Sequence, residues 1–91
     1  MARVIVKFYA TVREAVGTDC VRAQAESVAD LIRVLGDMFG PRFSDLMSSI
    51  ASDPDSIVVL INGRNPGRTR LLSKALSEGD EVAIFPPVSG G

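Results

Sequence analysis

Apolar and polar side chains alternate along three short segments of the chain, as they do in β-strands that turn one face toward a core. The alternating segments are residues 4–9, 20–25 and 81–85. The first two most simply form a hairpin, and the small side chains of the second predict a strand at a sheet edge. Cys20 begins that second segment, and we interpret it as a small packing residue, with a sulfur-relay role as the alternative.

Residues 28–39 carry the apolar spacing of an amphipathic helix of about three turns. The expected apolar stripe consists of Val28, Leu31, Ile32, Leu35, Met38 and Phe39. Ser27 is placed to cap the first turn, and Asp30 three residues later forms a carboxylate version of a capping box. Gly40 and Pro41 are expected to end the helix, Gly40 as a left-handed cap and Pro41 as a stop.

The remaining segments give shorter signals. Residues 57–61 are an unbroken β-branched and apolar run, which predicts a strand buried on both faces. Asn62-Gly63 predicts a tight turn into a brief return segment at residues 64–65. We expect a helical turn near residues 13–16, a short second helix between Phe43 and Ile50, and an irregular crossing over residues 66–76 in which Leu71, Leu72, Ala75 and Leu76 pack.

The order of elements is strand, strand, helix, strand, short strand, strand. A helix that follows a hairpin and crosses a sheet whose first and last strands lie side by side is the β-grasp arrangement. The sequence therefore predicts an α+β fold with a mixed sheet of four to five strands and one main helix on one face. We expect this domain to span residues 1–85 and a flexible, extended tail to span residues 86–91.

Composition narrows the function. Ninety-one residues with 46% apolar and 23% charged side chains suit one globular domain. A net charge of −1 predicts neither nucleic-acid binding nor a membrane anchor, and we expect no export or membrane insertion. The sequence has no His and one Cys, so it lacks the commonest general base and cannot form an internal disulfide. These features predict an intracellular, cytoplasmic protein without a metal site.

No set of residues predicts an enzyme active site. Paired carboxylates occur at Asp53/Asp55 and Asp80/Glu81, but both pairs stand in turn-like sequence where Asp usually bonds its own backbone. The glycines lack the strand, GxGxxG and helix context of a phosphate loop. Arg64, Arg68 and Arg70 form a local basic cluster, which is either a solvated loop or a contact for an anion or acidic partner.

The last six residues differ in composition from the domain before them. Pro86 and Pro87 stiffen the exit from the last strand, and Val88 and Ser89 lead to Gly90 and Gly91. Six extended residues reach about 20 Å, and a glycine pair fits a tunnel too narrow for side chains. The reactive group that such a tail delivers is the carboxylate of Gly91. A carboxylate needs activation, so we expect the chain to be a substrate carried between enzymes.

The stretch GDEVAIFPPVSGG, residues 79–91, closely resembles the C-terminal signature of the small, sulfur-carrier subunit of molybdopterin synthase, among the ubiquitin-like β-grasp sulfur carriers. VKFYATVREAVGTD at residues 6–19 is similar to that family's first strand and following loop, and LINGR at residues 60–64 to its third-strand turn. The resemblance covers essentially the whole chain.

The resemblance implies a non-catalytic carrier that binds no cofactor itself. An E1-like adenylyltransferase would use ATP to adenylate Gly91, and a sulfur donor protein would supply the sulfur of a thiocarboxylate. The large subunit of molybdopterin synthase would then accept the tail, Pro86, Pro87, Val88, Ser89 and Gly90 included, and move sulfur to a pterin precursor. By resemblance we expect a free monomer that forms a heterotetramer with that subunit.

A docking surface is expected beside the tail. If the first and last strands are neighbours, Tyr9, Ala83 and Phe85 share the sheet face opposite the helix, and exposed aromatic side chains there would bind a partner. Arg64 is a further expected partner contact. Alternatively, these side chains merely cover the sheet.

Three other functions are compatible with the sequence. The first is an archaeal-type ubiquitin-like modifier joined to lysines through Gly91. The second is a carrier for another sulfur pathway, such as that of thiamine. The third is a non-covalent interaction module whose tail is incidental.

Overall fold

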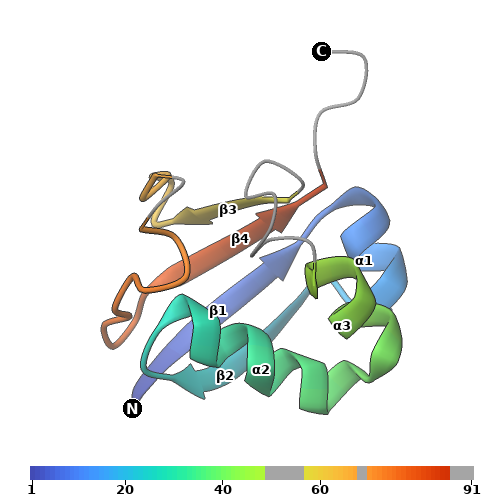
Figure 1. The fold of residues 1–91 in the computed structure, drawn as a ribbon, viewed down its shortest axis with the longest axis horizontal. Helices are drawn as coiled ribbons and strands as arrows, with labels where there is room; N and C mark the ends of the chain where they lie inside the picture. The colour runs from blue at the N-terminus through green and yellow to red at the C-terminus, as the bar shows by residue number, and fades with distance from the viewer. Residues whose placement is uncertain (49–56, 68–69, 87–91) are drawn as a thin grey trace.

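A computed structural model describes residues 1–48, 57–67 and 70–86. In this part of the chain, a mixed sheet of four strands is packed against helices (Figure 1). The strands are β1 (Ala2–Phe8), β2 (Cys20–Ala25), β3 (Val58–Ile61) and β4 (Glu81–Phe85), and the helices are α1 (Ala10–Val16), α2 (Val28–Phe39) and α3 (Pro41–Met47). The sheet order is β2-β1-β4-β3. The predicted α+β class is confirmed.

The first and last strands of the sequence, β1 and β4, pair at the centre of the sheet. β1 and β4 are parallel, with Val6 opposite Val82 and Phe8 opposite Ile84. β1 also pairs antiparallel with β2, which confirms the predicted hairpin, and β3 pairs antiparallel with β4. The β-grasp arrangement is therefore confirmed. Five residues of the predicted tail, 87–91, lie outside the described residues.

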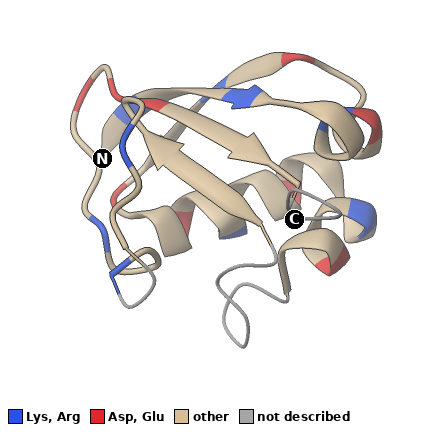
Figure 2. Cartoon of the chain, turned by 90° about the horizontal axis from the view of Figure 1, so that it is seen from above, with Lys and Arg blue, Asp and Glu red and all other residues tan. Residues whose placement is uncertain are grey.

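The core lies between the sheet and the helices. Val4, Val6 and Phe8 of β1 are buried, as the alternation predicts. Figure 2 shows that the longest helix, α2, lies along one side of the strands. The aromatic rings of Phe8, Phe39 and Phe43 pack with centroids 5.6 to 6.3 Å apart, which ties β1 to α2 and α3. The two contacts of Phe8 are edge-to-face, a geometry that adds to the hydrophobic stabilisation.

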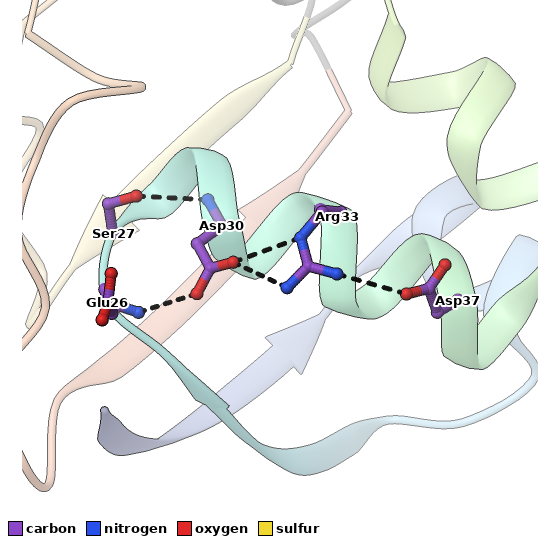
Figure 3. Close-up of polar contacts among 5 residues, drawn as sticks. All are labelled: Glu26, Ser27, Asp30, Arg33 and Asp37. Atoms are coloured by element: carbon purple, nitrogen blue, oxygen red, sulfur yellow. Dashed lines mark hydrogen bonds and ion pairs between the residues drawn. The ribbon is translucent and has the colours of Figure 1, made fainter.

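The start of α2 is held by the predicted capping residues (Figure 3). Ser27 Oγ accepts a hydrogen bond from the Asp30 backbone N–H at 3.2 Å. The Asp30 carboxylate accepts one from the Glu26 N–H at 3.0 Å, so the capping box is displaced by one residue from the expected Ser27 N–H. Asp30 also bonds Arg33, which reaches on to Asp37. The backbone N–H of Glu26, followed by Arg33, lowers the pKa of Asp30.

The helical parts differ from prediction at three places. α1 is a full helix from Ala10 rather than a single turn. Gly40 has φ 84° but ψ −164°, so it is not a left-handed helical cap. Pro41 was expected to stop the helix, but it is the first residue of a new helix, α3. Proline is well suited to that first position because its missing N–H would have no partner there. Met38, expected in the apolar stripe, is 50% exposed.

The prediction that residues 57–61 are buried on both faces is wrong. Val59 and Ile61 are buried, whereas Val58 and Leu60 are half-buried. The reason is topological: β3 lies at the edge of the sheet, and the helices cover only one of its faces. In the crossing before β4, Leu71 and Leu76 are buried as expected, but Ala75 is exposed.

The turn after β3 is confirmed and has an additional function. Asn62 and Gly63 have φ values of 53° and 80°, the left-handed conformations of a tight hairpin turn. The Asn62 side chain donates to Asp80 Oδ1 at 2.9 Å and accepts from the Glu81 N–H at 2.9 Å. The turn therefore also fixes the start of β4. The predicted return segment is reduced to a single bridge between Ile61 and Arg64.

No helix in the described part of the chain is both long enough and apolar enough to cross a membrane.

Candidate functional site

The end of β4 is where the predicted tail begins. Val82 and Ile84 are fully buried, which anchors β4 in the core. Pro86 follows Phe85 directly and is half-buried. Proline has no N–H and cannot continue the hydrogen-bonded ladder. The expected site residues Pro87, Val88, Ser89, Gly90 and Gly91 lie outside the described residues.

Two aromatic side chains meet beside this exit, as the sequence predicts. The rings of Tyr9 and Phe85 stack with their centroids 4.3 Å apart and their planes 9° apart. Tyr9 is 39% exposed and Phe85 is half-buried. The pair is not part of the core, which lies on the other side of the sheet. The stack therefore forms a partly exposed aromatic surface beside the exit of the chain from β4.

A sharp corner in the chain positions Tyr9. The Tyr9 N–H donates to the carbonyl of Ile84 at 3.2 Å, and its own carbonyl accepts from the N–H groups of Val12 and Arg13. At the first residue of α1, Ala10 has φ 52°, a left-handed conformation that is unfavourable for a residue with a Cβ atom. Strained backbone of this kind is often found at functional sites. The corner stops β1 from running past Phe85.

Apolar side chains extend the aromatic pair across the open face of the sheet. Strand alternation places the half-buried Val58 and Leu60 of β3 on this face, with Val58 opposite Phe85 and Leu60 opposite Ala83. We call Tyr9, Val58, Leu60, Ala83 and Phe85 the exit patch. Sequence reasoning missed Val58 and Leu60 because their run looked fully buried. The edge position of β3 would have revealed them.

An ion pair borders the exit patch. Lys7, opposite Ala83 in the register, has its Nζ 3.1 Å from Oε1 of Glu81. The hydrogen bond and the charge of Glu81 raise the pKa of Lys7. Both side chains are substantially exposed, so the pair contributes little to stability.

Arg64 does not lie with the aromatic residues. It follows the turn at Asn62, and Asn62 contacts Glu81 at the start of β4, whereas Phe85 is at the other end of that strand. The structure therefore divides the predicted partner contacts into two places. Tyr9 and Phe85 come together near the exit, and Arg64 lies at the opposite end of the sheet. Strand direction explains the separation, because β3 runs antiparallel to β4.

The remaining candidate residues are the cysteine and the paired carboxylates. The interpretation of Cys20 as a packing residue is wrong, since it begins edge strand β2 on the open face and is exposed. Asp80 accepts from the Ser77 N–H at 2.7 Å, the turn chemistry expected for it. Asp53 and Asp55 lie outside the described residues. Within residues 1–48, 57–67 and 70–86, no three His, Cys, Asp or Glu side chains form a group that could hold a metal ion.

Known proteins resemble this chain over nearly its whole length. The family model named ThiS family matches residues 6–91. Small archaeal modifier protein 1 of Haloferax volcanii is 33% identical over 85 residues, covering 93% of this chain and 97% of that protein. The molybdopterin synthase sulfur carrier subunit of Haemophilus influenzae is 33% identical over 92 residues, covering 94% and 96%.

Solved structures agree with this result. The solution structure of small archaeal modifier protein 1 from Methanosarcina acetivorans superposes with a TM-score of 0.76 at 34% identity, covering 100% of this chain and 98% of that one. The ubiquitin-like form of the β-grasp fold is thereby confirmed. The match to residues 6–91 also includes the β4 segment and the glycine pair that the sequence singled out. The chain belongs to the ThiS family of small ubiquitin-like sulfur carriers and modifiers.

Proposed function

We propose that this protein carries sulfur as a thiocarboxylate on Gly91 and donates it for molybdopterin synthesis. The observation that carries the proposal is the signature at residues 79–91, which joins a buried strand to Pro86-Pro87 and the glycine pair. The name of the Haemophilus influenzae relative, which includes molybdopterin synthase, supports the same pathway. In this proposal the chain is not an enzyme and binds no cofactor itself.

The proposed chemistry is confined to the carboxylate of Gly91. An E1-like adenylyltransferase joins this carboxylate to the AMP part of ATP, with release of pyrophosphate. A sulfur donor protein then supplies sulfur to the activated carbonyl carbon, and AMP leaves. The bond to AMP is necessary because a free carboxylate is a poor electrophile. Within the described residues, the chain's own contribution is to hold the base of the tail in a fixed place.

The exit patch is the proposed docking surface for the large synthase subunit. Apolar surface that surrounds a rigid aromatic pair is typical of the centre of a protein interface. Its position beside Pro86 would let the partner bind the domain and receive the tail together. We propose that the free protein is a cytoplasmic monomer and that it forms a heterotetramer with the large subunit.

A second candidate function is covalent modification of other proteins. The observation that favours it is the 33% identity to small archaeal modifier protein 1, together with the match to the solution structure of its Methanosarcina acetivorans namesake. Activation of Gly91 as an acyl-adenylate would serve both functions, and a lysine amine would then take the place of sulfur. Carriage for another pathway, such as thiamine synthesis, uses the same thiocarboxylate and differs in its acceptor.

Intact-mass spectrometry of the protein from its native host tests the proposal. We expect a species in which one oxygen is replaced by sulfur, and loss of that species after Gly91 is deleted. The same lysate is searched for branched lysines. Because Lys74 is the last site for trypsin, a lysine joined to Gly91 would carry residues 75–91 as its branch. Branched lysines without the sulfur-containing species would replace the first proposal by the second.

Reconstitution with a purified large subunit then tests the pathway. Thiocarboxylated protein should convert the pterin precursor to molybdopterin, whereas the carboxylate form should not. Failure of the thiocarboxylated form, with a known carrier active in the same assay, would overturn the molybdopterin assignment and leave sulfur carriage for another pathway.

A further inference from the structure

A second surface feature lies at the end of the sheet opposite the exit patch. Here a cleft of about 560 Å³ opens between the turn after β3 and the loop that precedes β4. Its lining includes Arg64, Arg70 and Lys74, together with Ile61 and Pro66. We call it the basic cleft. Its volume is within the range of sites that bind ligands larger than a single ion.

The three cations of the basic cleft have no ion-pair partner among the described residues. By contrast, Arg3, Lys7, Arg13 and Arg33 each lie within 4.0 Å of a carboxylate. Among the described Lys and Arg side chains, only Arg22 and Arg42 are also unpaired, and neither lines this cleft. Three positive charges without an ion-pair partner among the described residues are thus gathered at this cleft, and Figure 2 shows how all Lys and Arg are distributed along the chain.

Backbone hydrogen bonds hold the stems of these cations in place. The Arg64 N–H and carbonyl both pair with Ile61, at 3.0 and 2.8 Å. The Lys74 carbonyl accepts from the Val28 N–H at the start of α2 at 3.0 Å, and the Arg70 N–H donates to Gly67 at 3.2 Å. The loop is anchored further by the buried Leu71. A ligand would therefore meet charges whose attachment points are already ordered.

The acidic residue of the cleft does not neutralise them. Asp80 also lines the cleft, but its two oxygens accept hydrogen bonds from Asn62 Nδ2 at 2.9 Å and from the Ser77 N–H at 2.7 Å. No cation lies within ion-pair distance of it in the described residues. Its carboxylate fixes the turn, and three positive charges remain directed at solvent against this one negative charge.

We propose that the basic cleft binds an acidic peptide segment of a partner protein. Arginine forks and a lysine ammonium suit carboxylate side chains. The half-buried Pro66 and the exposed Ala75 give the cleft an apolar surface that suits apolar side chains between those acids, which a small inorganic anion would leave uncovered. Three cations in a single cleft are fewer than the extended track of phosphate contacts that gives nucleic-acid binding its affinity.

The position of the cleft separates this partner from the tail. The cleft lies where β4 begins, and the aromatic pair of the exit patch lies where β4 ends. Figure 1 shows the course of β4 between these two ends. Four residue steps along a strand correspond to roughly 13 Å. A protein held through the basic cleft would leave the exit patch and the tail accessible to a second protein. The surface would let an activating or donor protein stay bound while the tail is passed on.

Titration of the full chain with a short fluorescein-labelled peptide of alternating Glu and Leu tests this proposal. We expect saturable binding that weakens as salt is raised, and NMR shift changes confined to residues 61–66 and 70–77. The double charge reversal R70E/K74E should weaken binding about tenfold or more. The matched control R22E/R42E, which changes the net charge by the same amount outside the cleft, should bind like the unaltered chain.

Other results would overturn the proposal. These are equal binding of a Gln-Leu peptide, equal weakening in both double variants, or shift changes over the exit patch. Full displacement of the peptide by millimolar inorganic phosphate would indicate a small-anion site, and tighter binding of single-stranded RNA than of the peptide would indicate a nucleic-acid site. Deletion of Gly90 and Gly91 should leave peptide binding unchanged, so this test does not depend on the proposed sulfur chemistry.

Discussion

Tyr9 and Phe85 come from the two ends of the chain and stack ring on ring, 4.3 Å apart, where the sheet ends. Neither residue belongs to the buried core. The contact exists because β1 and β4 are parallel neighbours, so that both strands finish at the same end of the sheet. At this end the sequence continues into Pro86.

Replacing Phe85 by Arg should weaken docking of the proposed large subunit. Loss of a central aromatic contact costs binding about 2 kcal/mol or more, whereas loss of the stack with Tyr9 costs the free energy of unfolding only about 1 kcal/mol. Isothermal titration calorimetry measures the first quantity and chemical denaturation the second. Gln24→Arg, on the exposed face of β2, is the control and should change neither. Global unfolding of the Phe85 variant would place this ring in the core.

Ala10→Gly should stabilise the protein slightly, by up to about 1 kcal/mol, because glycine adopts positive φ without the steric cost of a Cβ atom. Ala29→Gly in α2 is the control, since an exposed helical position loses up to about 1 kcal/mol on the same substitution. Urea denaturation compares the two variants with the unaltered chain. A loss of stability in both would show that Ala10 carries no strain.

Substitutions at Asn62 separate the contribution of the turn conformation to stability from the contribution of the side-chain hydrogen bonds. Asn62→Gly keeps the positive φ but removes both hydrogen bonds, for a loss of about 1 to 3 kcal/mol. Asn62→Ala loses the same bonds and adds about 1 kcal/mol or more of backbone strain. Denaturation should therefore rank the unaltered chain first, the Gly variant second and the Ala variant third. Equal stability of all three would contradict the contact with Asp80.

Acid should destabilise the fold through Asp30. Its carboxylate accepts from the Glu26 N–H and bonds Arg33, and these contacts hold the pKa of Asp30 below its usual value of 3.8. A folded-state pKa below the unfolded one gives stability that is complete above the unfolded value and is lost as pH falls through the folded one.

The measurement is the free energy of unfolding from about pH 6 down to about pH 2. Asp30→Asn should flatten its decline below about pH 4. Asp45→Asn is the control because the Asp45 side chain makes no hydrogen bond within the described residues, and it should preserve the slope. An unchanged slope in the Asp30 variant would assign the acid sensitivity elsewhere. Glu78 is the next candidate, since the Arg3 N–H and side chain lower its pKa.

Gly91→Ala tests the proposed tunnel for the tail. The added methyl group should reduce adenylation by the E1-like enzyme by about tenfold or more, if the partner's site excludes side chains. The unfolding midpoint should not change, because no residue of the described core lies beyond Ile84. Pyrophosphate release measures the first step. Turnover equal to that of the unaltered chain would contradict the tunnel.

Local patterns of apolar and polar residues predicted the strands and the helix that bury one face against the core. The alternation at Val4, Val6 and Phe8 and the stripe of α2 both follow directly from the requirement that apolar side chains face one core. Asn62-Gly63 predicted its turn because few residues adopt positive φ cheaply. Tyr9 and Phe85 could be paired from sequence once the first and last strands were taken as neighbours.

Long-range placement accounts for what the sequence did not predict. Nothing in the run at residues 57–61 shows that β3 is an edge strand, so Val58 and Leu60 looked buried. Arg64, expected as a further partner contact, lies apart from the aromatic residues because β3 runs antiparallel to β4 and ends at the opposite end of the sheet. Cys20 faces solvent because it begins an edge strand on the open face.

The parallel pairing of β1 and β4 also has a consequence for biosynthesis. Val6 cannot meet Val82 until ribosomal synthesis has passed residue 82 and the last strand has emerged. Contacts between such distant residues slow folding, because a long loop must close before any of them forms. Until then the edge of β1 that later pairs with β4 is unpaired. An open strand edge of this kind is prone to aggregation. A nascent chain truncated before Glu81 should therefore require a chaperone, and a complete domain should not.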